Sequence, residues 1–230
     1  MLAGLPLVDH HCHGVLLTEL DRAGVERGMT ESDAPAPPGT TMFDTPVGLV
    51  VRRWCAPVLG LEPHADAAAY LAVRARLGTA ESTLRLLRAA LLSDVLVDTG
   101  LRGPDFVEPA GVPVVLLHCH PYHRQAAWLA QVFPHVHADV GLALNHVGAG
   151  APGYLAECLE LTPFAKLLFS TDAFGLPELF CTGAALFREA FGRVLDSWIA
   201  HGACSTADAE RIARLLGAAN ARRVYWLESR

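Results

Sequence analysis

Two histidines one residue apart stand at the end of an apolar run near the start of the chain. The run Leu5-Pro-Leu-Val-Asp-His-His-Cys-His-Gly14 predicts a strand that ends in His11 and His13. Side chains at positions i and i+2 of a strand point the same way, so this pair could bind one metal ion. Clustered histidines also occur in ordinary polar loops. The carboxyl end of a first strand favours the metal interpretation, because (β/α) barrels carry their active sites at that edge.

Further candidate ligands follow two later apolar runs. The run over residues 112–117 leads into His118, our preferred ligand, and His120 repeats the two-residue spacing. His120 and His123 are weaker candidates that could bind substrate, support a ligand or cap the next helix. The last expected strand runs into Asp172, which could touch a metal or, alternatively, serve as the N-cap of the following helix.

Neutral imidazoles and one carboxylate are a ligand set suited to hydrolysis. A divalent ion held by them lowers the pKa of its water toward about 7, and a nearby carboxylate can then act as base and later as acid. Asp172 is our candidate for that role, with His118 as a further catalytic candidate. Asp9 is expected to face away from the metal, while Asn145 and His146 could reach the site.

Composition limits the classes of function. The chain has 230 residues, of which 52% are hydrophobic and 18% are charged, so we expect one compact, soluble domain over residues 1–230. Neither a membrane span nor a signal peptide is expected, which makes the cytoplasm the default location. The six cysteines form no Cys-x-x-Cys pair and are expected to be mostly buried thiols. A net charge of −6 with dispersed arginines favours a small-molecule partner over nucleic acid or an anionic membrane.

The pattern along the chain predicts an α/β fold, because short apolar runs alternate with helical patterns. We expect buried parallel strands at residues 5–9, 94–98, 112–117, 136–140 and 166–169, and helices at residues 121–133, 154–161 and 176–200. A last helix opens with a capping box at Ser205 and Asp208, carries Ile212, Leu215 and Leu216 as its apolar stripe, and is expected to end at Gly217.

A predominantly helical insertion occupies about residues 18–92, interrupted by a Pro-rich piece at residues 33–39. Leu84, Leu87 and Leu91 are expected on one helix face. The insertion leaves the expected sheet at the edge that carries His11 and His13. It could therefore cover the site as a lid, or pack beside it without touching substrate.

Four segments together resemble the amidohydrolase superfamily, in particular the amidohydrolase-related branch with the FluG-like and nodulin-like N-terminal domains. They are Val8-Asp-His-His-Cys-His13, Leu116-Leu-His-Cys-His-Pro121, Phe169-Ser-Thr-Asp172 and Asn220-Ala-Arg-Arg-Val-Tyr-Trp-Leu227. The resemblance implies a metal-dependent hydrolase with a TIM-barrel scaffold. It matches His11 and His13 to the first-strand ligands, His118 to the sixth-strand histidine and Asp172 to the eighth-strand aspartate. Zinc is the default ion, with manganese or iron as alternatives.

The chain departs from that branch in its middle. A fourth-strand Lys or Glu and a fifth-strand metal histidine are not found, because a short link over residues 101–111 leads directly to the strand before His118. A complete barrel has eight units in about 250 residues, so we expect an incomplete barrel of five strands with open edges. Open edges predict a homo-oligomer, a collapsed smaller fold or poor solubility.

Several functions therefore stay open at this stage. The first is a hydrolase acting on an amide or other C–N bond of a small molecule. The others are a catalytically impaired relative, such as a pseudoenzyme or interaction protein, and a non-hydrolytic decarboxylase with the same metal cage. A metal-dependent phosphoesterase is disfavoured by the segments that end at Asp172 and Leu227.

Overall fold

The structure is a computed structural model that describes residues 2, 4–30, 39–98 and 113–227. The link at residues 101–111 and the Pro-rich piece, apart from Gly39, lie outside the described residues. The elements in chain order are β1 (Leu7–Cys12), α1 (Arg22–Arg27), η1 (Met42–Asp44), α2 (Pro46–Val50), η2 (Val51–Cys55), α3 (Ala56–Val58), α4 (Ala67–Ala90), β2 (Leu92–Val97), β3 (Val114–Leu116), α5 (His123–Val132), β4 (Val136–Asp139), α6 (Ala143–Val147), η3 (Gly148–Gly150), α7 (Ala151–Cys158), η4 (Phe164–Lys166), β5 (Leu167–Leu168), α8 (Pro177–Ala200), α9 (Thr206–Arg214), η5 (Leu215–Ala219) and α10 (Asn220–Val224).

The strands pair in parallel, as the alternation of strands and helices predicted. β1 pairs with β2, and β4 pairs with β3 on one side and β5 on the other. The chain just after β5 runs beside β1, with the amide of Asp172 donating to His11 O at 3.0 Å and the amide of His13 donating to Ala173 O at 2.8 Å. The order across the molecule is therefore β2, β1, β5, β4, β3, and the expected α/β class is confirmed.

The expectation that all five strands are buried is wrong for β2 and β3. Exposed and partly buried residues alternate along β2, where Val95 is 47% and Val97 is 50% exposed. Val114 of β3 is exposed as well. Both strands stand at the ends of the order above, so each has a strand neighbour on one side only among the described residues. The sheets are small, and within the described part of the chain they do not close into a barrel.

The C-terminal residues cover one face of the sheet. Val8 and Leu168 pack with Ala221 and Val224 of α10 in a small cluster of their own. The residues that alternate with them on the strands, such as Leu7, belong to the main core. Because alternate residues of a strand face opposite sides, α10 covers the face opposite the main core. Part of the apolar surface that an open sheet would expose is thereby buried.

The last helix begins as predicted but ends later. Ser205 is its N-cap, and the reciprocal bonds between Ser205 and Asp208 complete the capping box. The expected end at Gly217 is wrong, because helical conformation continues through η5 into α10. A Cβ atom on Gly217 would lie 2.9 Å from Pro6 O and 3.0 Å from Leu5 Cδ2. This glycine therefore permits a close approach to the segment before β1.

We expect Gly217→Ala to lower the free energy of unfolding by about 1–2 kcal/mol, because the methyl group must displace backbone at Pro6. Gly153, inside α7, has nothing within 4 Å of an added Cβ. Gly153→Ala should instead raise stability by up to about 1 kcal/mol, through helix propensity. Urea unfolding of both variants checks the pair, and equal effects would contradict the close-approach explanation.

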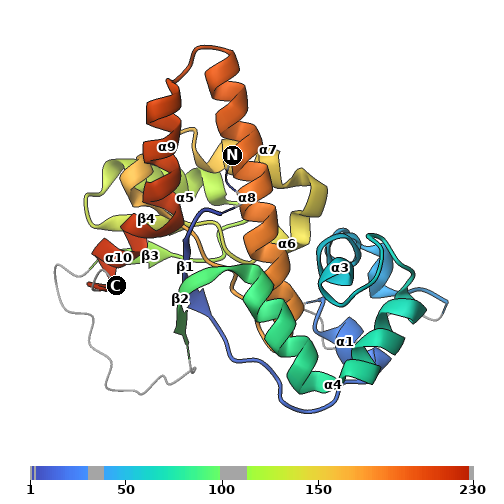
Figure 1. Cartoon of the computed structure of the whole chain (residues 1–230). Coiled ribbons are helices and arrows are strands. Elements are labelled where there is room, and N and C mark those ends of the chain that lie inside the picture. Colours follow the sequence, from blue (N-terminus) through green and yellow to red (C-terminus); the bar gives the residue numbers. More distant parts are fainter. Residues whose placement is uncertain (1, 3, 31–38, 99–112, 228–230) are drawn as a thin grey trace, which may run out of the picture.

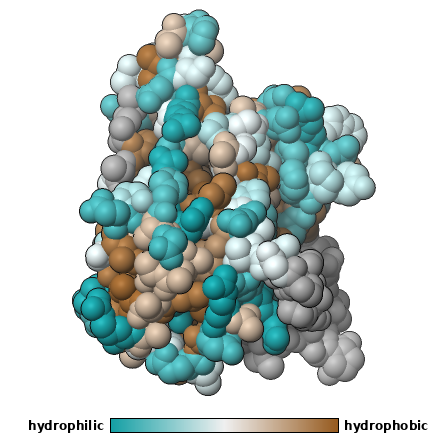
Figure 2. Space-filling view, turned by 90° about the vertical axis from the view of Figure 1, so that its right-hand side faces the viewer, coloured by the Kyte–Doolittle hydropathy of each residue, from teal (hydrophilic) through white to brown (hydrophobic). Residues whose placement is uncertain are grey.

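The helical insertion ends where expected, since β2 begins at Leu92, and it packs mainly against α8 through α4. The expected apolar face of α4 is wrong, because Leu84 and Leu91 are exposed while Leu86 is buried. The helices α1, α3 and α4 gather on one side of the strands (Figure 1). Figure 2 shows the molecule from that side, with a hydrophobic area toward the lower left of a surface that is otherwise mixed or hydrophilic.

A buried polar contact joins α4 to α8. Arg74 Nε lies 2.7 Å from Glu178 Oε1, and both side chains are almost fully buried. The hydroxyl of Tyr70 donates to the same oxygen at 3.1 Å. Among the described helices, none is long and apolar enough to cross a membrane.

Candidate metal centre

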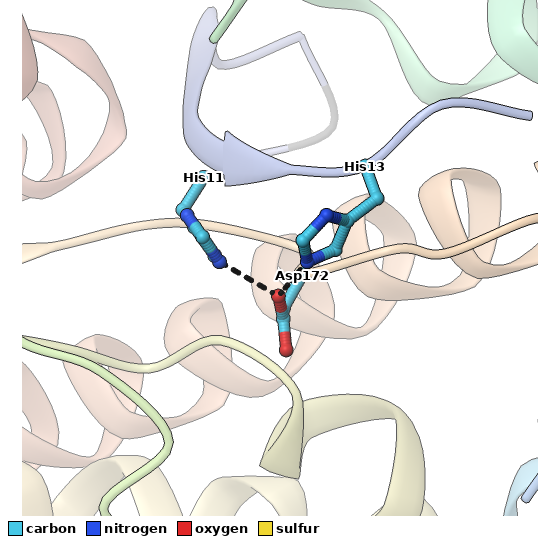
Figure 3. Close-up of side chains that lie close together, drawn as sticks. All are labelled: His11, His13 and Asp172. Atoms are coloured by element: carbon cyan, nitrogen blue, oxygen red, sulfur yellow. Dashed lines mark ion pairs between the residues drawn. The ribbon is translucent and has the colours of Figure 1, made fainter. Parts of the chain in front are cut away.

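His11, His13 and Asp172 lie together, as the strand-end positions predicted. His11 and His13 extend from the end of β1, and Asp172 extends from the segment between β5 and α8 (Figure 3). One ligand atom of each residue lies within 4.8 Å of those of the other two. The Nε2 atoms of His11 and His13 are 3.0 and 3.6 Å from Asp172 Oδ1. This is an arrangement of two nitrogens and one oxygen around a common point.

The backbone holds Asp172 in a restricted conformation. Its φ of 48° lies in the left-handed region, which aspartate tolerates better than most residues. The preceding Thr171 donates both its amide, at 2.9 Å, and its hydroxyl to the buried carboxylate of Asp9. Burial raises the pKa of Asp9 to about 6, although the bonds from Thr171 lower it. Asp9 thus anchors the segment of Asp172 instead of facing the ligands, as expected from its position.

The hydrogen bonding of this group fits a cation. Asp172 Oδ1 is buried and has no hydrogen-bond partner among the described residues, although two imidazole nitrogens face it. His13 Nδ1 lies 3.1 Å from Asp98 O, which leaves its Nε2 directed toward Asp172. Such a carbonyl contact commonly orients a metal-binding histidine. The close approach of Asp172 raises the pKa of His11, against the effect of burial. Two imidazoles and a carboxylate suit zinc, manganese or iron.

His118 contacts the other oxygen of the same carboxylate. Its Nε2 atom is 3.0 Å from Asp172 Oδ2, and its ring centre is 5.6 Å from that of His11. The residue follows β3 with a φ of 57°, and its side chain is 41% exposed. The three histidines expected at the site therefore converge on the carboxylate of the fourth expected residue, Asp172. His118 differs from the other two histidines because it does not share Oδ1 and remains open to solvent.

The two weaker candidates, His120 and His123, contact each other at the start of α5. His123 Nε2 contacts Glu157 Oε2 at 2.6 Å, and His120 stacks on His123 with ring centres 5.4 Å apart. No contact between this pair and Asp172 occurs among the described residues. Neither caps α5, whose N-cap residue is Tyr122 and lacks a side-chain capping bond. The alternative role of Asp172 as an N-cap is wrong too, because Leu176 occupies that position of α8.

A buried polar network beside the site was missed in the sequence. Asp139, at the end of β4, accepts hydrogen bonds from the Ser170 hydroxyl and from the Gly141 amide at 3.0 Å. His10 Nε2 lies 3.3 Å from its carboxylate, and His10 Nδ1 lies 3.1 Å from the hydroxyl of Tyr225. Although burial acts in the opposite direction, the His10 contact and these bonds hold the pKa of Asp139 below its usual value. In the sequence, Asp139 inside a largely apolar run was the signal that could have indicated this network.

A cavity of about 450 Å³ adjoins the metal candidates. His13, His118 and Asp172 line it, and so do Asn145 and His146, as their positions after β4 suggested. Its other described walls are largely apolar and include Leu16, Leu20, Leu142, Phe174, Leu176 and Leu179. The start of the helical insertion thus borders the cavity, while α4 packs against α8.

The comparisons with known proteins give a sequence relative for half of the chain and a structural neighbour for nearly all of it. No family model matches the chain. The chain is 36% identical over 118 residues to Protein fluG of Emericella nidulans, a match that covers 50% of this chain and 14% of that protein. A crystal structure of a candidate metal-dependent hydrolase from Lactobacillus casei ATCC 334 superposes with a TM-score of 0.78 at 17% identity. The superposition covers 99% of this chain and 98% of the other. The chain therefore shares the fold of that protein.

Proposed function

We propose that the chain is a metal-dependent hydrolase of the amidohydrolase type, which cleaves an amide or other C–N bond of a small molecule. The observation that carries the proposal is the convergence of His11, His13 and His118 on the two oxygens of Asp172. A divalent cation held by this group would supply a Lewis acid and lower the pKa of a water molecule toward about 7.

The chain's own residues have distinct roles in this proposal. Asp172 stands at the cavity wall, where its carboxylate can accept a proton from the attacking water and return it to the leaving nitrogen. His118, which is open to the cavity, either completes the ligand set or donates a hydrogen bond to the carbonyl oxygen of the substrate. The apolar walls bind the rest of the molecule and reduce access of bulk water.

The strand order supports a barrel origin for the scaffold. In a (β/α)₈ barrel, the first strand lies between the second and the last, and the strands before the last follow in reverse order. The observed order β2, β1, β5, β4, β3 has the same arrangement when three central units are left out. We propose an incomplete barrel on this basis, with His118, Asp139 and Asp172 at carboxyl ends of strands.

Metal removal and restoration test the proposal. We expect about one equivalent of zinc, manganese or iron in the purified, gel-filtered protein, measured by elemental mass spectrometry. Dialysis against a chelator should abolish hydrolysis of any amide that the metal-loaded protein cleaves, and adding back the same ion should restore the activity. Gel-filtered protein that binds no metal would contradict the proposal.

Among the described strands, β2 and β3 each lack a neighbour on one side, which favours a second candidate, a catalytically impaired relative that keeps the fold. Stoichiometric metal binding without turnover of any amide would support this candidate. A homo-oligomer that covers the edges stays a prediction, which sedimentation velocity checks on the same sample.

A further inference from the structure

One arginine borders the cavity of the metal candidates and has no side-chain partner among the residues that the structure describes. Arg27, the last residue of α1, lines the cavity together with His118 and Asp172. Its side chain makes no ion pair or hydrogen bond with any residue that the structure describes. Arg22, on the same helix, differs because its Nε lies 2.8 Å from Glu26 Oε1. Within the described part of the chain, no side chain competes with a ligand for the guanidinium of Arg27.

Tight packing holds the end of α1 at this place. A Cβ atom on Gly28 would lie 2.5 Å from Leu176 Cγ, so only glycine permits this approach. Leu176 follows Asp172 closely in the chain and lines the same cavity. The segment before α1 is anchored too, since Leu16 N donates to Gly175 O and Gly175 N donates to Gly14 O, both at 2.9 Å. The position of Arg27 is thus tied to the segment that carries Asp172.

The charges of the described lining favour an anionic ligand. Asp172 is its one carboxylate, and three histidine nitrogens already surround that group. Arg27 is its one permanent positive charge, whereas Asn145 and Thr171 are engaged in bonds within the protein. Arginine binds a carboxylate through two parallel hydrogen bonds, which gives both affinity and orientation.

We propose that Arg27 binds a free carboxylate of the substrate, and that the cavity selects small amides that carry such a group beside an apolar body. The inference rests on the proposed function, because it assigns the substrate class of the same site. Leu16, Leu20 and Phe174 contact the apolar body, and the carboxylate at Arg27 orients the amide toward Asp172.

Matched compounds test the assignment. N-acetyl amino acids with apolar side chains are compared with their C-terminal carboxamides as substrates of the metal-loaded protein. The release of acetate measures hydrolysis. The free acids should have a kcat/KM at least about tenfold higher, as expected for a hydrogen-bonded charge pair. Arg27→Gln should bring this ratio close to one, and Arg27→Lys should restore part of it. Arg22→Gln, the control on the same helix, should leave the ratio as in the wild type.

Binding measurements separate failure of this inference from failure of the proposed function. If no amide is hydrolysed, saturation-transfer NMR with the same compounds still compares acid with carboxamide. Preference for the acid that is lost in Arg27→Gln supports the carboxylate site even without turnover. Equal binding or turnover of the two forms by the wild type, or an unchanged preference in Arg27→Gln, overturns it.

Discussion

Asp172→Asn is expected to weaken metal binding by more than about 100-fold, because residues that merely support a ligand already contribute about 10- to 100-fold. The substitution removes the charge that His11, His13 and His118 face and keeps the shape of the side chain. Asparagine also tolerates the left-handed backbone at this position, where φ is 48°. The fold should therefore persist, and isothermal titration with zinc measures the loss directly.

The same variant should lower kcat for a responsive amide by about 10²- to 10⁴-fold when the metal is in excess, since the amide side chain cannot accept the proton. Asp196→Asn is the matched control, because Asp196 is an exposed carboxylate on α8. It should keep both metal affinity and rate. Wild-type affinity in Asp172→Asn would contradict the assignment of Asp172 as a ligand, and His11→Ala/His13→Ala provides an independent check.

Arg74→Met is expected to lower the free energy of unfolding by about 3–5 kcal/mol, because it leaves the carboxylate of Glu178 buried without its counter-charge. Glu178 is fully buried, and its Oε2 atom has no hydrogen-bond partner among the described residues. After the substitution, only the Tyr70 hydroxyl remains as a side-chain donor to Oε1. Urea unfolding monitored by circular dichroism gives the free-energy change.

Two further variants separate the buried charge from the loss of an arginine side chain. Arg74→Met/Glu178→Leu should recover most of the stability, because apolar residues of similar volume often replace a buried ion pair without cost. Arg85→Met removes an exposed pair with Glu81 on the same helix and should cost less than about 1 kcal/mol. A cost for Arg74→Met as small as that for Arg85→Met would show that Glu178 becomes neutral easily or reaches water.

The group around Asp172 was predictable because its signals are local. The spacing of His11 and His13 places both side chains on one side of a strand end, whatever the rest of the fold is. His118 and Asp172 each follow an apolar run, and parallel strands bring such positions to one edge. The same local logic gave the five strands and the capping box at Ser205, with boundaries shifted by a few residues.

Other features depend on contacts between residues far apart in sequence. The exposure of β2 follows from its place at the end of the strand order, which its own composition does not encode. Gly217 resembles a helix stop, but the approach of Pro6 requires the glycine there. The pairing of Arg74 with Glu178 joins residues 104 positions apart, so no pattern along α4 alone could predict it.

The sequence by itself determined the residue types of the candidate ligands, their positions at strand ends and the parallel α/β class, because these follow from short-range periodicity. Only the tertiary structure decided that Asp139 joins His10 and Ser170 in a buried network, and that α10 covers one face of the sheet. It also decided that Arg27 borders the same cavity as Asp172, through the packing of Gly28 on Leu176. The physical reason is that burial and pairing of a polar group depend on which distant segments surround it.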